Sequence, residues 1–119
     1  MTATRFDVIG IGNAIVDVIT HADDDFLKVE GLEKGAMTIV EAKQLIALYD
    51  RIKPTVECSG GSAANTIAGL ASLGGRGAFI GKIRDDHLGD IFRQDIRATG
   101  VTFDTLPATT GPQTATSLI

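Results

Sequence analysis

The chain has 119 residues, enough for one domain with a hydrophobic core, and 44% of them are hydrophobic. Its net charge of −4 and its scattered lysines and arginines argue against a nucleic-acid-binding protein, which needs a basic face. The single cysteine, Cys58, excludes an internal disulfide and a cysteine-rich metal site, and it favours a cytoplasmic location. The apolar runs are too short to cross a bilayer, so we expect no membrane partner.

The first half of the chain alternates between short apolar or β-branched runs, which predict strands, and one stretch with apolar residues at helical spacing. Asp23-Asp24-Asp25 suits the start of a further helix or, equally well, a solvated turn. Pro54 ends the helical stretch, because proline cannot continue a helix. In chain order, we expect strands over 6–11, 16–20 and 36–40, and a helix over 41–52.

The second half predicts strands and helices in alternation. A small apolar segment follows Gly60-Gly61 and ends before Gly74-Gly75, and its alanines indicate a helix packed closely on a sheet. Asp85 or Asp86 is suited to cap the next helix. In chain order, we expect a strand over 55–59, a helix over 62–73, a strand over 78–81, a helix ending at Gly100 and a strand over 113–119.

This order of elements predicts an α/β fold with flanking helices and a parallel core. The strands near Val18, Met37 and Ser117 have fewer helices beside them in the sequence, and we expect them to form a separate small sheet. The chain stops within a strand pattern at 116–119, which favours the N-terminal piece of a longer protein over a short protein that ends on an edge strand.

Two glycine-anchored polar clusters, 10–17 and 59–65, follow predicted strands, and the second opens a predicted helix. Together they supply close backbone approach, carboxamides that donate and accept, a hydroxyl, and a carboxylate that receives two neighbouring hydroxyl donors. This set suits a neutral, polyhydroxylated small molecule and contains no group for breaking bonds. The candidate site residues are Asn13, Asp17, Gly60, Gly61, Ser62 and Asn65.

Two known nucleotide-binding patterns fit these clusters poorly. A dinucleotide-binding fingerprint needs a third glycine where this chain has Ile15, and the Asp17 carboxylate would repel a pyrophosphate. A phosphate loop needs a lysine that the segment 59–65 lacks. His21 and His87 have no companions at metal-ligand spacing, so we expect no metal site.

Structural roles remain open for the same residues. Asn13 could be a turn residue, and Asp17 could be an exposed strand residue. Gly61 and Ser62 could form only a helix cap. A buried Asn65 would have to be paired, either by a ligand or by the facing loop.

The clusters resemble the N-terminal half of the ribokinase-like (PfkB) carbohydrate kinases, and within that family they are nearest to the adenosine kinases. The segment 10–17 resembles the family's opening motif, whose Asn and Asp hold ribose hydroxyls, and 60–65 resembles its di-glycine motif. Lys34–Thr38 and Gly111–Thr116 resemble strands of the family's lid. Two positions depart from the family pattern: Ile67 stands where a small residue is usual, and Arg84 stands where a glycine is usual.

This resemblance implies a three-layer ribokinase-like core plus a small β lid, with lid strands at about 17–22, 35–39 and 112–119, and residues 1–119 as the N-terminal portion of the kinase domain. It places Met37 near the substrate and implies pairing of two subunits through the lid. It also implies ATP and Mg²⁺ as cofactors and a catalytic base, all bound or supplied by segments that follow this chain in the family.

The expected function is therefore an ATP-dependent kinase for the primary hydroxyl of a nucleoside or sugar, with adenosine as the first choice. Ribose and fructose remain alternatives within the family. A non-catalytic module that binds a sugar or nucleoside is the alternative from another functional class.

Overall fold

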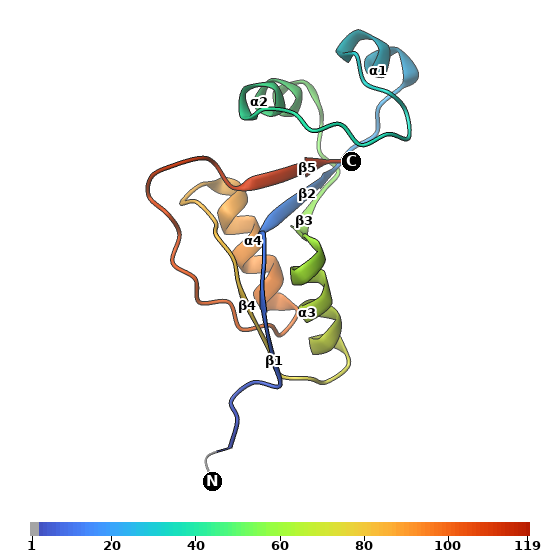
Figure 1. The fold of residues 1–119 in the computed structure, drawn as a ribbon. Helices are drawn as coiled ribbons and strands as arrows, with labels where there is room; N and C mark the ends of the chain where they lie inside the picture. Colours follow the sequence, from blue (N-terminus) through green and yellow to red (C-terminus); the bar gives the residue numbers. More distant parts are fainter. Residues whose placement is uncertain (1–2) are drawn as a thin grey trace.

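Two small β-sheets and four helices make up the part of the protein that a computed structural model describes, residues 3–119. In one sheet, β1 (Val8–Ile11) pairs in parallel with β4 (Gly77–Ile80). In the other, β2 (Ile15–Ile19) lies between β3 (Val56–Gly60), which is antiparallel to it, and β5 (Ala115–Leu118), which is parallel to it. The two sheets follow one another along an elongated molecule of 61 × 32 × 20 Å (Figure 1).

The four helices lie in two groups. Helices α3 (Ser62–Ser72) and α4 (His87–Ala98) pack on the sheets, α3 against β1 and β4, and α4 against β2 and β3. Helices α1 (Asp24–Glu30) and α2 (Ala42–Arg51) lie at the opposite end of the molecule from β1 (Figure 1). The helix starts agree with the sequence: the side chain of Asp23 caps α1 and that of Asp86 caps α4.

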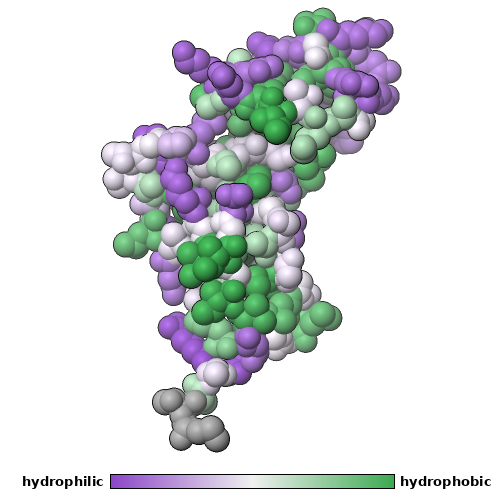
Figure 2. Space-filling view, viewed as in Figure 1, coloured by the Kyte–Doolittle hydropathy of each residue, from purple (hydrophilic) through white to green (hydrophobic). Residues whose placement is uncertain are grey.

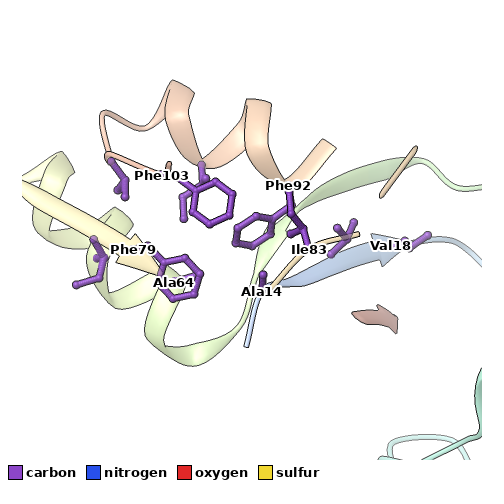
Figure 3. Packing of buried hydrophobic residues seen from close by; sticks show 11 residues of the cluster. Ala14, Val18, Ala64, Phe79, Ile83, Phe92 and Phe103 are labelled. Carbon is purple, nitrogen blue, oxygen red and sulfur yellow. The ribbon is translucent and has the colours of Figure 1, made fainter. Parts of the chain in front are cut away.

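The core forms where α3 and α4 meet the two sheets. Phe79 of β4, Phe92 of α4 and Phe103 have ring centroids 5.3 to 6.0 Å apart. Figure 3 shows these rings beside Ala14, Ala64 and Ile83, with Val18 farther along β2. Val16 and Val18 of β2 are both 0% exposed, so one face of the three-stranded sheet belongs to this core.

The small sheet differs from the expected one in its third strand. Strands near Val18 and Ser117 do pair, as β2 and β5. The expected strand at 36–40 is wrong: this segment is not a strand, and Met37 and Ile39 are 89% and 90% exposed. The side of β2 that does not face β5 pairs with β3 instead. Residues 36–40 therefore have no neighbouring strand to pair with their backbone groups.

Apolar side chains remain exposed on β1 and β4. Val8, Ile9, Ile11 and Ile80 are 45% to 76% exposed. Figure 2 shows apolar side chains gathered over the lower half of the molecule, where Figure 1 places β1. Within residues 3–119, therefore, helices cover this sheet only in part.

Among the described residues, no helix combines the length and the apolar character that crossing a membrane requires.

Candidate functional site

The two glycine-anchored clusters meet at one end of the β2–β3 pair. Ile15 of β2 pairs with Gly60 of β3, so the residues just beyond this pair, Asn13 and Gly61, lie side by side. The carbonyl oxygen of Asn13 is only 2.7 Å from the position that a Cβ on Gly61 would occupy. The structure thus brings together two segments that lie almost fifty residues apart in the sequence.

The carboxylate of Asp17 lies over Gly60. Both residues face the same side of the sheet, because Asp17 is two residues from Ile15, the direct partner of Gly60. A Cβ on Gly60 would lie 2.3 Å from Oδ2 of Asp17, so only glycine leaves room for this carboxylate. The hypothesis that Asp17 lies beside the start of the Ser62 helix therefore agrees with the geometry.

Asp17 is half-buried and has no hydrogen-bond donor within the described part of the chain. Burial raises the pKa of this carboxyl above its ordinary value, because removing water disfavours the charged form. A carboxylate without a donor is ready to accept hydrogen bonds from hydroxyl groups of a ligand.

Gly61 sets the geometry of the turn from β3 into α3. Its φ is +94°, a conformation that side-chain-bearing residues rarely adopt, and the Asn13 carbonyl leaves no space for a Cβ. Helix α3 begins here without a side-chain cap, so the proposed role of Ser62 as only a cap finds no support. The first amide groups of α3 are thus left without a side-chain acceptor, at the positive end of the helix dipole.

The other predicted site residues differ in how they are placed. Ser62 and Asn65 are both exposed on the first turn of α3, where residues three apart share a face. The pairing expected for a buried Asn65 therefore does not arise. Asn13 is exposed in the β1–β2 turn, and a simple turn role stays open for its side chain. Met37 lies in the α1–α2 connection with its side chain 89% exposed, outside the strands, turns and helix that carry the other site residues.

Asp86, which the sequence predicts only as a possible helix cap, also holds the residue before β5 in place. Oδ1 of Asp86 accepts hydrogen bonds from the Gly89 amide at 2.7 Å and the Thr114 hydroxyl at 2.6 Å, and Oδ2 accepts one from the Thr114 amide at 2.9 Å. Burial alone would raise the pKa of Asp86, but the donors Thr114 and Gly89 and the charge of Arg84 outweigh it and lower the pKa. Only the fold places Thr114, one residue before β5, beside this cap.

Arg84, which replaces the usual glycine of the family pattern, has a structural role here. Its amide donates to the Thr114 hydroxyl at 3.0 Å, and its guanidinium donates to the carbonyl of Gly111. Arg84 therefore holds the loop that leads into β5.

No group of three or more His, Cys, Asp or Glu side chains comes together within residues 3–119. The side chain of His87 is 75% exposed, with Nε2 3.7 Å from Glu57 Oε2.

Comparison with known proteins finds relatives that are all described as adenosine or sugar kinases. An adenosine kinase from Sinorhizobium meliloti is 55% identical, and the match covers 97% of this chain with a TM-score of 0.81. A probable sugar kinase from Rhizobium etli is 49% identical over 98% of this chain, with a TM-score of 0.82. Probable fructokinase-4 from Arabidopsis thaliana is 33% identical over 64 residues, or 54% of this chain.

The chain spans 35% of the length of each of the two solved relatives and 20% of the fructokinase. The sequence pattern of the pfkB family of carbohydrate kinases matches residues 36–119, which include Gly60, Gly61, Ser62 and Asn65. This match covers most of the chain, and the solved relatives share its mixed α/β architecture. The chain therefore belongs to the pfkB family of carbohydrate kinases.

Proposed function

We propose that the protein is an ATP-dependent kinase that phosphorylates the primary hydroxyl of a nucleoside or sugar, and that this chain supplies the substrate-binding part. The observation that carries the proposal is the Asp17 carboxylate. It is half-buried, has no donor among the described residues, and lies over Gly60 beside the uncapped start of α3. An acceptor of this kind is suited to a vicinal diol, which offers two donors from adjacent carbons.

Adenosine is the substrate that we favour. The solved relative at 55% identity is described as an adenosine kinase, and its similarity extends over almost the whole chain. Fructose is the second candidate, because fructokinases from plants and from Escherichia coli are among the relatives. The fructokinase matches cover about half of the chain, so they favour fructose less strongly.

Each residue of the site has a proposed task. Asp17 receives two hydroxyl donors, and Asn13 and Asn65 supply groups that donate and accept. Gly60 and Gly61 let the ligand lie on the main chain, and Ser62 and the first amides of α3 donate to ligand oxygens. Together these groups would hold the primary hydroxyl in one orientation, and positioning is a large part of the rate enhancement in phosphoryl transfer.

Family membership implies ATP, with Mg²⁺ to neutralise phosphate charge. Mg²⁺ is usually held by one or two carboxylates together with water and phosphate oxygens, and residues 3–119 bring together no group of three candidate ligands. We propose that other segments of the protein bind the nucleotide and supply the base. The three-stranded sheet, with the α1–α2 connection that contains Met37, is proposed to act as the lid and to pair two subunits.

The proposal is tested by steady-state kinetics of the full-length protein with ATP and Mg²⁺ and a panel of adenosine, ribose and fructose. We expect the highest kcat/KM with adenosine. Asp17→Asn should weaken binding of the preferred substrate by about 1.5–3 kcal/mol for each charged hydrogen bond that is lost.

Lys28→Gln serves as a matched control, because Lys28 is an exposed charge on α1, which lies apart from α3 (Figure 1). It should leave kcat/KM unchanged. Binding of a panel member without phosphate transfer would instead support the non-catalytic module. Unchanged affinity in Asp17→Asn would remove the basis of the proposed site.

A further inference from the structure

A second carboxylate, that of Asp95, contacts the strand just before the Gly60–Gly61 turn from the α4 side of the sheet. Asp95 lies on α4, and its Oδ2 accepts hydrogen bonds from both the backbone amide of Ser59, at 2.6 Å, and the Ser59 hydroxyl, at 2.7 Å. Ser59 is the residue directly before Gly60 and Gly61. Nothing in the sequence marks this pair, because the two residues are 36 positions apart and belong to different elements.

The position of Ser59 in the sheet explains why this contact matters. Ser59 pairs with Val16, whereas Asp17 pairs with Cys58, so the Ser59 side chain points to the opposite face of the sheet from the Asp17 carboxylate. Strand β3 is an edge strand, and the Ser59 amide would have no strand partner on its outer side. Asp95 satisfies this amide and the hydroxyl together, through the stronger, charge-assisted class of hydrogen bond.

We propose that Asp95 is a positioning residue for the proposed substrate site, acting through Ser59 on the Gly60–Gly61 turn. By fixing Ser59, the β3 residue directly before Gly60 and Gly61, Asp95 fixes the distance between Gly60 and the Asp17 carboxylate and the direction in which α3 starts. The close approaches at Gly60 and Gly61 leave little tolerance for a shift of this backbone. The inference rests on the proposed kinase function and deepens it.

The test uses the full-length protein with adenosine and ATP. Asp95→Asn keeps the size of the side chain but loses its charge, and it should lower kcat/KM for adenosine roughly tenfold, because small misplacements of positioning groups are costly. The KM for ATP should stay within about twofold of the wild-type value, since the change acts on the proposed substrate site and other segments are proposed to bind the nucleotide. Ser59→Ala removes only the hydroxyl bond and should give a smaller loss in the same direction.

Asp90→Asn is the matched control, because Asp90 is an exposed carboxylate on the same helix. It should behave as the wild type. A purely structural role of Asp95 would lower the folded fraction and kcat together and leave both KM values unchanged, and that result would overturn the inference. Ser59→Ala decides the question if Asp95→Asn does not fold: wild-type kinetics in it would also overturn the inference.

The proposed function and this inference fail in different ways. If the wild-type protein transfers phosphate to no member of the panel, the proposed function fails and this inference with it. If the wild type is active and the Ser59 and Asp95 variants match it, only the positioning role is lost.

Discussion

The two faces of the three-stranded sheet use carboxylates in opposite ways. On the face toward α4, Asp86 and Asp95 each accept hydrogen bonds from the backbone and from a hydroxyl group of a neighbouring segment. On the other face, Asp17 is half-buried and has no donor among the described residues. The pKa values of Asp86 and Asp17 accordingly move in opposite directions, downward for Asp86 and upward for Asp17.

This difference separates the carboxylates that hold the fold from the one that we propose to bind a ligand. A paired carboxylate stabilises the protein, because its charge is compensated by donors in the native state. A desolvated carboxylate without donors costs stability until a ligand supplies them. Such a cost is expected at binding sites, where function and stability compete.

The largest effect is expected for Gly61→Ala. A residue with a side chain is strained at φ +94°, and the new methyl group would meet the Asn13 carbonyl, so we expect a loss of roughly 1–3 kcal/mol in the free energy of unfolding and loss of substrate binding. Urea unfolding and a binding titration measure both. Gly111→Ala is the control: its φ is +90°, but a Cβ there meets only the Lys82 amine at 3.9 Å. Equal losses in both variants would show that strain alone acts at Gly61.

Asp86→Ala tests the face that holds the fold. Loss of the α4 cap and of the Thr114 contacts should cost about 2 kcal/mol at pH 7. Because the folded-state pKa lies below the ordinary value of 3.8, the wild-type advantage is present above that pH and disappears as pH falls through the lowered pKa. Unfolding curves from pH 7 to pH 3 measure the difference, and a gap between the two proteins that widens toward low pH would contradict this role.

Tyr49→Phe acts on the same face but at the far end of β3 from Gly60. The Tyr49 hydroxyl of α2 donates to the Glu57 carboxylate, and its loss should cost about 1 kcal/mol of stability while substrate affinity stays unchanged. The Glu57 hydrogen bond raises the pKa of Tyr49 to about 12, so its contribution is present below pH 10 and is lost as pH rises toward 12. A fall in substrate affinity would show that the site depends on all of β3 and not on Ser59 in particular.

The smallest change in stability is expected for Asp17→Asn. The free energy of unfolding at pH 7 should stay within about 0.5 kcal/mol of the wild type or rise slightly. Because the folded-state pKa is raised, the protonated carboxyl favours folding at low pH, and the wild type loses this contribution as pH rises through the raised pKa. Unfolding curves at pH 3.5 and pH 7 test the sign. A clear loss of stability at pH 7 would mean that Asp17 holds the fold and does not await a ligand.

Local sequence signals located α2, α3 and α4 well, and they left the acidic run before α1 open between a helix start and a solvated turn. Asp23 and Asp86 cap α1 and α4, Pro54 follows α2, and Gly74 and Gly75 follow α3. These signals act within a few residues, so a sequence without relatives is enough to read them. The glycine-anchored clusters were also located from the sequence, because close backbone approach requires glycine wherever it occurs.

The pairing of the strands could not be read in the same way. Residues 36–40 have a strand-like composition but are not paired, whereas β3 pairs with one side of β2 and β5 pairs with the other. Strand formation depends on which partner is available, and that is a property of the whole fold.

By itself, the sequence determined the helices other than α1, the α/β class and the two clusters that the fold brings together, because capping, periodicity and the need for glycine are local properties. Only the tertiary structure decided that Asp17 lies over Gly60 without a donor, that Asn65 is exposed, and that Asp86 and Asp95 reach Thr114 and Ser59. These contacts join residues 28 to 43 positions apart, so they depend on how sheets and helices pack and not on any short pattern in the chain.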